Sequence, residues 1–118
     1  MKTELSVNEL VTQNIRIINR TEQTVNNAIA VISIPQGFRA EESSLATLRY
    51  DGLIEKYETN YDSINLYLRD VRQGEIKDLS IDYRPGYPAK ITAGQIKAYD
   101  YYNPGIEGIQ KPFIITVE

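Results

Sequence analysis

The sequence contains no cysteine and no histidine. Histidine is the commonest metal ligand and the usual general base near neutral pH, and cysteine is the other typical ligand of zinc sites. The absence of both excludes zinc sites, Ser-His-Asp triads and Cys-His nucleophile pairs. Carboxylates are the only plausible catalytic groups left, and none is marked by a catalytic or calcium-binding motif. We therefore expect a protein that is not an enzyme and binds no cofactor or metal.

Long apolar runs and a strong net charge are also missing. No segment approaches the roughly 20 apolar residues of a membrane-spanning helix. The 13 basic and 16 acidic residues give a net charge of −3, and the basic residues are scattered. This pattern predicts binding neither to nucleic acid nor to an anionic membrane. With 42% hydrophobic and 25% charged residues, the composition is that of a globular protein, and the length indicates a single domain over residues 1–118.

The sequence is instead rich in alternation of apolar and polar residues with a period of two, which indicates β-strands. Ile64, Leu66 and Leu68 show it most clearly, and a second such series ends at Tyr83. Turns rich in Gly, Pro and Asn separate these segments, which is typical of an antiparallel β-sandwich. We predict a mainly β protein with strands within residues 13–21, 27–37, 52–60, 63–71, 76–86, 94–102 and 111–118.

One segment departs from this alternation and predicts a short helix over residues 41–50. Leu45 and Leu48 are three positions apart, as on one face of a helix. Two glutamates fall in the first turn, where carboxylates interact favourably with the helix dipole. Gly52 follows the end and suits a left-handed stop. We expect this helix to cap or cross one end of the sandwich.

Nine tyrosines invite a binding interpretation, and three of them lie in the stretch AGQIKAYDYYNPG at residues 93–105. Tyr99 and Tyr101 share one strand face there, and the Asn-Pro-Gly that follows is expected to turn the chain. We expect Tyr99 or Tyr101 to be mostly buried, with its hydroxyl hydrogen-bonded. The alternative is a freestanding adhesion or carbohydrate-binding sandwich with tyrosines as stacking platforms, and its candidates are Tyr57, Tyr61 and Tyr67.

Three segments in chain order, residues 26–38, 54–71 and 93–105, resemble the C-terminal receptor-binding domains of α2-macroglobulins. Similar domains occur in complement components and other thioester proteins. The most recognisable part is the run Tyr99-Asp100-Tyr101-Tyr102, which ends a strand in that family. The resemblance implies a macroglobulin-type β-sandwich with an inserted helix, in agreement with the alternation.

The resemblance further implies that this chain would be the last domain of a larger protease-trapping inhibitor. The thioester and the bait region of such inhibitors belong to other domains. The domain itself would hold no catalytic residue and would dock against the thioester region and other domains of its parent. After activation it would meet a protein receptor or a protease. The resemblance also implies an extracellular or cell-envelope location.

In the animal members of that family, two lysines one helical turn apart on the inserted helix bind acidic pockets of an endocytic receptor. Glu42 and Ala46 occupy those places here, so this electrostatic recognition should fail. Arg49 is the only cation on the predicted helix, and Lys56 lies just beyond it. We name Arg49 and Lys56 as the candidate partner-binding residues.

Overall fold

Strands in three sheets make up most of the chain in a computed structural model, which describes residues 2–93, 95–100, 103–110 and 113–118. One sheet has the order β10-β9-β3-β6-β5, and two smaller sheets have the orders β2-β7-β4 and β1-β11-β8. Neighbouring strands are antiparallel except β1 and β11, which pair in parallel. The strands are β1 (Glu4–Leu5), β2 (Val11–Ile18), β3 (Val25–Ser33), β4 (Phe38–Ala40), β5 (Lys56–Thr59), β6 (Ser63–Val71), β7 (Ile76–Pro85), β8 (Ala89–Ala93), β9 (Ile96–Asp100), β10 (Asn103–Gln110) and β11 (Phe113–Val117).

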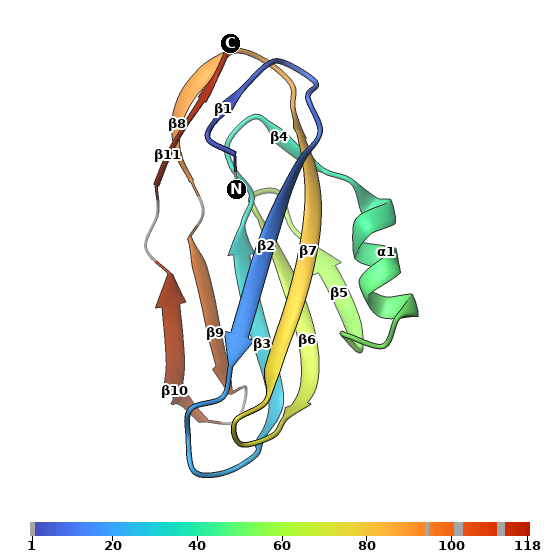
Figure 1. The fold of residues 1–118 in the computed structure, drawn as a ribbon, viewed down its shortest axis with the longest axis vertical. Helices are drawn as coiled ribbons and strands as arrows, with labels where there is room; N and C mark the ends of the chain where they lie inside the picture. The colour runs from blue at the N-terminus through green and yellow to red at the C-terminus, as the bar shows by residue number, and fades with distance from the viewer. Residues whose placement is uncertain (1, 94, 101–102, 111–112) are drawn as a thin grey trace.

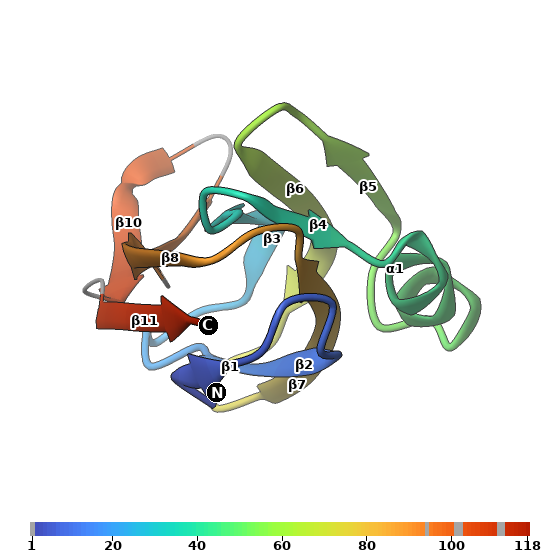
Figure 2. The ribbon, with the colours of Figure 1, turned by 90° about the horizontal axis from the view of Figure 1, so that it is seen from above.

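The sheets form facing layers whose inward side chains meet in one core. β2 and β7 cross in front of β3 and β6 in Figure 1, and Figure 2 shows the same arrangement from above. The predicted antiparallel β-sandwich with one short helix is thus confirmed. Residues at alternate strand positions supply the core from both layers, among them Ile15, Ala30, Ile32, Ile64, Leu66, Leu79 and Ile81.

A bulge between β3 and β6 changes the alternation that the sequence predicts. Ala28 pairs with Arg69, whereas its neighbour Ile29 pairs with Tyr67, so β6 carries an extra residue at this point. Arg69 takes a left-handed conformation with φ of 57°. The extra residue reverses the face of the side chains that follow it in β6, and an extra residue of β3 between Val25 and Ala28 restores the pairing register. Val71 is therefore buried, although strict alternation would place it outside.

The helix α1 (Glu42–Tyr50) begins one residue after the predicted start and ends as predicted. The Gly52 amide donates to the Arg49 carbonyl at 3.1 Å, and the Leu53 amide donates to the Leu48 carbonyl at 3.0 Å. This pair of bonds is the Schellman arrangement, which needs a left-handed residue after the helix. Gly52 supplies it with φ of 76°. The predicted glycine stop is confirmed.

α1 connects an edge strand of one layer, β4, to an edge strand of the other, β5. It therefore runs along one side of the sandwich beside β5 and β7, as Figure 1 shows. Leu45, Leu48 and Ile54 are buried in the core. The helix closes part of the gap between the two sheet edges.

Several predicted boundaries need correction. β2 begins at Val11 and β3 at Val25, each before its predicted range. β5 covers only Lys56–Thr59 of the predicted residues 52–60, because residues 52 and 53 complete the helix end. Asn103, expected to start a turn, instead begins β10. The register between β10 and β9 shifts between Asn103 and Glu107, and such an irregularity on an edge strand accommodates a proline. The strands β1, β4, β8 and β10 were not predicted.

Candidate interaction surfaces

The two candidate cations lie on different faces of the molecule. Arg49 is exposed in the last turn of α1. Lys56 begins β5, with its Nζ 4.5 Å from the centroid of the Tyr67 ring and 3.9 Å from the Glu58 carboxylate. Side chains alternate along a strand, so Lys56 faces outward while Tyr57 faces the helix side. Arg49 and Lys56 therefore do not form one cluster in the part of the chain that the structure describes.

Two half-buried tyrosines lie on the outer face of the five-stranded sheet. Tyr67 and Tyr99 both pair with Ile29, one from each side, and Ile29 is only 4% exposed. Lys97 Nζ lies 5.6 Å from the centroid of the Tyr99 ring. Partial burial raises the pKa of the Tyr67 hydroxyl, and the nearby Glu58 carboxylate adds to that shift. These rings flank an apolar side chain, which indicates a packing role for Tyr99.

The tyrosine motif is described only in part. Tyr99 is half-buried and not mostly buried as expected, and Asp100 ends β9 opposite Ala28 of β3. Tyr101 and Tyr102 lie outside the described residues. The prediction that Tyr99 or Tyr101 is mostly buried therefore rests on Tyr101 and stays a prediction.

The largest fully buried side chain of the described residues is another tyrosine, Tyr83 of β7. Its hydroxyl donates to Oε1 of Gln13, a buried residue of β2, at 3.0 Å. Burial raises the pKa of the Tyr83 hydroxyl well above its ordinary value. The alternating series Leu79, Ile81 and Tyr83 already placed this residue inside. The sequence therefore contained the signal for the burial of Tyr83.

The three tyrosines of the carbohydrate-binding alternative do not share one surface. The half-buried Tyr57 donates its hydroxyl to Oε1 of Glu42 at 3.3 Å, on the helix side of β5. Tyr67 lies on the opposite face of the same sheet, whereas Tyr61 follows β5 and is fully exposed. A stacking platform needs its rings side by side. The structure does not provide that arrangement with these three residues.

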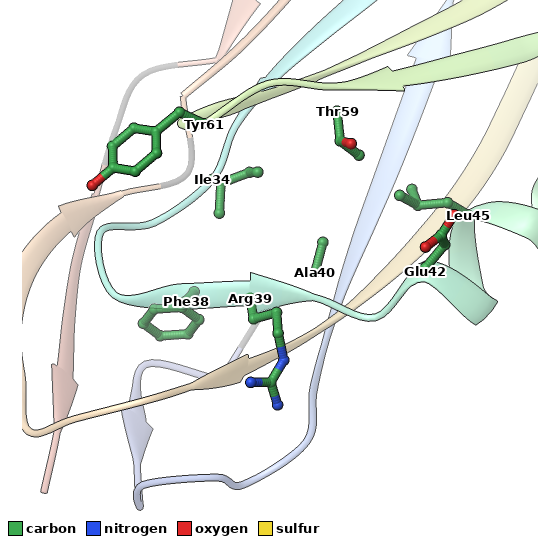
Figure 3. A pocket seen from close by; sticks show the side chains of 8 residues that line it. All are labelled: Ile34, Phe38, Arg39, Ala40, Glu42, Leu45, Thr59 and Tyr61. Atoms are coloured by element: carbon green, nitrogen blue, oxygen red, sulfur yellow. The ribbon is translucent and has the colours of Figure 1, made fainter.

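A pocket of about 260 Å³ opens between β4 and β5 beside the start of α1. Figure 3 shows Ala40 and Leu45 pointing toward it, whereas Arg39 points away from Ala40 on the other side of β4. Six of its eight lining residues lie within residues 34–45, and the other two, Thr59 and Tyr61, close the pocket from the far side. It is lined by Ile34, Phe38, Arg39, Ala40, Glu42, Leu45, Thr59 and Tyr61.

Two arginines lie opposite each other where β4 pairs with β7. Arg39 faces Arg84 across the ladder. Arg84 is neutralised, since its Nε lies 2.8 Å from Oε1 of Glu41 and its Nη1 donates to the Asn8 carbonyl at 2.8 Å. Arg39 is exposed and makes no ion pair or side-chain hydrogen bond with any residue that the structure describes. The face of β4 opposite Ala40 thus carries a positive charge that no described residue pairs.

The described ranges contain neither a membrane-spanning helix nor an acidic metal site. Within residues 2–93, 95–100, 103–110 and 113–118, no helix is long and apolar enough to cross a membrane. The same ranges contain no group of three or more acidic side chains arranged to hold a metal ion.

Comparison with known families gives a match that extends over most of the chain. The family described as A-macroglobulin receptor binding domain matches residues 23–111. The chain belongs to this family. No curated protein matches the sequence at a significant level.

Solved structures similar to this receptor-binding domain come from bacterial α2-macroglobulins. Salmonella α2-macroglobulin reacted with methylamine matches with a TM-score of 0.77 and 19% identity, over 96% of this chain and 8% of that one. Native Escherichia coli α2-macroglobulin from domain MG7 to the C-terminus matches with a TM-score of 0.83 and 16% identity, over 100% of this chain and 21% of that one. The chain therefore spans a small part of the proteins whose fold it shares.

The family assignment gives meaning to two residues on α1. Glu42 and Ala46 are one helical turn apart and both exposed, at the places where the animal receptor-binding domains were inferred to carry lysines. Tyr57 binds the Glu42 carboxylate, and the partial burial of Tyr57 together with this negative charge raises the pKa of its hydroxyl. Arg49 lies three residues after Ala46 on the same face, so this face of the helix offers one negative and one positive charge, and the positive charge is not at either lysine position.

Proposed function

We propose that this chain is the C-terminal, non-enzymatic interaction domain of an α2-macroglobulin-like protease inhibitor. The observation that carries the proposal is the family match over residues 23–111. The fold likeness supports it, because the matching α2-macroglobulin chains are several times longer than this one. A parent of this kind would act outside the cell or in the cell envelope.

In this proposal, the domain packs against the thioester region of its parent and shifts when a protease cleaves the bait region. A sandwich with one continuous core moves as a rigid body, since close-packed interiors deform little. Contacts are then exchanged at its surface. Arg49 and Lys56 are the candidate contact residues, and both are exposed. Partner residues of negative charge suit them.

The test uses the full-length parent protein before and after cleavage by trypsin. We expect trypsin to be trapped, and amide hydrogen exchange in α1 and β5 to change on cleavage. Reversing the charges with Arg49→Glu and Lys56→Glu should alter that change, whereas Arg20→Glu, an exposed arginine between β2 and β3, should leave it intact. A parent that traps no protease, or unchanged exchange throughout this domain, would contradict the proposal.

A further inference from the structure

The strand β4 has a free edge that faces the pocket. β4 ends the sheet β2-β7-β4, and among the described strands it pairs only with β7. The Glu41 amide donates to the Asp82 carbonyl at 2.8 Å, and the Gly86 amide donates to the Gly37 carbonyl at 2.9 Å. In an antiparallel ladder, backbone groups point alternately toward and away from the partner strand. The amide and carbonyl of Ala40 therefore point away from β7.

The side chains around this edge differ on the two faces of β4. Ala40 and Phe38 are half-buried and line the pocket, into which Leu45 also points, and Glu42 and Thr59 add polar groups to its wall. Arg39 lies on the opposite, exposed face of the strand. An extended segment laid along β4 would place alternate side chains on these two faces. One series would meet the apolar side chains Ala40, Phe38 and Leu45 in the pocket, and the other would lie beside Arg39.

The positive charge of Arg39 determines the charge of the added residues that lie on its face of β4. Like charges directly opposite each other in a sheet are unfavourable. Glu41 relieves that repulsion for Arg84 alone, so Arg39 is the member of the pair that still needs an anion. A carboxylate on the added segment would supply it.

We propose that the free edge of β4 accepts an added strand whose residues are alternately apolar and acidic, supplied by another domain of the same parent chain. A three-residue edge offers few backbone hydrogen bonds, so the association is weak for a free peptide. A segment held in the same chain has an effective concentration in the millimolar range, which compensates for weak contacts. The source of the segment rests on the proposed function, whereas its chemistry rests on β4, Arg39 and the pocket.

The chemistry can be tested on this chain with a synthetic octapeptide in which valine and leucine alternate with glutamate. In an NMR titration we expect shifts confined to β4, the start of α1 and Thr59, and slower hydrogen exchange of the Ala40 amide. Arg39→Glu should weaken binding about tenfold, and Arg20→Glu should not. A second peptide has lysine in place of glutamate. Its affinity for the unchanged chain should be no higher than the affinity of the glutamate peptide for the Arg39→Glu variant.

Ala40→Pro tests strand addition directly. Proline removes the amide that faces the pocket, and it is tolerated on the free side of an edge strand, so binding should be lost while the fold remains. If Ala40→Pro unfolds the chain, strand addition is tested instead by the Ala40 amide of the unchanged chain, whose hydrogen exchange should slow when the glutamate peptide binds. Unchanged exchange at Ala40, or equal binding of the two peptides, overturns the proposal. Neither result bears on protease trapping, so failure here is distinguishable from failure of the proposed function.

Discussion

Replacing Tyr83 with phenylalanine should destabilise the fold through a single lost hydrogen bond. The ring is fully buried, and its hydroxyl has one partner in the described structure, Oε1 of Gln13. Tyr83→Phe keeps the ring but leaves that buried acceptor without a donor. An unsatisfied buried polar group costs about 1–3 kcal/mol. We therefore expect the free energy of unfolding to fall by about 1–3 kcal/mol.

The partner substitution separates the hydrogen bond from packing. Gln13→Met has a similar shape and leaves the Tyr83 hydroxyl unpaired, so alone it should cost about 1–3 kcal/mol for the same reason. The double variant removes both polar groups, and such a replacement is nearly neutral when the shape is kept. Urea unfolding followed by circular dichroism at neutral pH gives the four free energies of this double-mutant cycle. The coupling energy should lie at about 0.5–3 kcal/mol.

Additive losses would refute this reasoning. If the double variant loses the sum of the two single losses, the hydroxyl and the amide do not depend on each other. The same conclusion holds if Tyr83→Phe alone is neutral. Equal urea dependence of the free energy in all four proteins is the control, because a changed slope signals an altered unfolded state.

The burial of Tyr83 also predicts that stability depends on alkaline pH. The pKa of its hydroxyl is raised in the folded state above the ordinary tyrosine value of 10.0. The stability that it contributes is therefore fully present below that value and is lost as the pH rises above it. Thermal unfolding between pH 8 and 11 should therefore show a shallower decline for Tyr83→Phe than for the parent, and parallel declines would contradict the assignment. Leu45→Ala should cost about 2–5 kcal/mol, because this side chain of α1 is 1% exposed, and a loss below about 1 kcal/mol by urea unfolding would show that the helix is not anchored there. Gly37→Ala should lower the free energy of unfolding more than Gly52→Ala. Both glycines have positive φ, so alanine is strained at either position. An added Cβ at Gly37 would also lie 2.6 Å from Cζ of Tyr87, whereas at Gly52 it would meet nothing within 4 Å. Tyr87→Ala in the Gly37→Ala background should remove the difference, and equal melting temperatures for the two glycine variants would argue against the contact.

The arrangement of β6, β7 and α1 could be predicted from local sequence because each has a regular pattern. Alternation at Ile64, Leu66 and Leu68 reports a strand with one buried face, and those residues are buried. Leu45, Leu48 and the glycine that follows report a helix and its end. These signals survive folding because hydrophobic burial acts on the same periodicity that the backbone imposes.

The family resemblance was also accessible from sequence, and the match over residues 23–111 confirms it. The short strand β4 was not accessible, since three residues carry too little periodicity to identify. The bulge opposite Ala28 was hidden for another reason: register between distant strands depends on both partners.

The sequence by itself determined the class of the fold, the place of the helix and the absence of His- or Cys-based chemistry, because composition and periodicity are properties of a chain read in order. Only the tertiary structure decided that Tyr83 hydrogen-bonds to Gln13, that Arg39 faces Arg84, and that a pocket opens beside β4. Those features join residues from separate segments. Their energies come from desolvation and charge proximity, and neither exists until the chain brings its distant parts together.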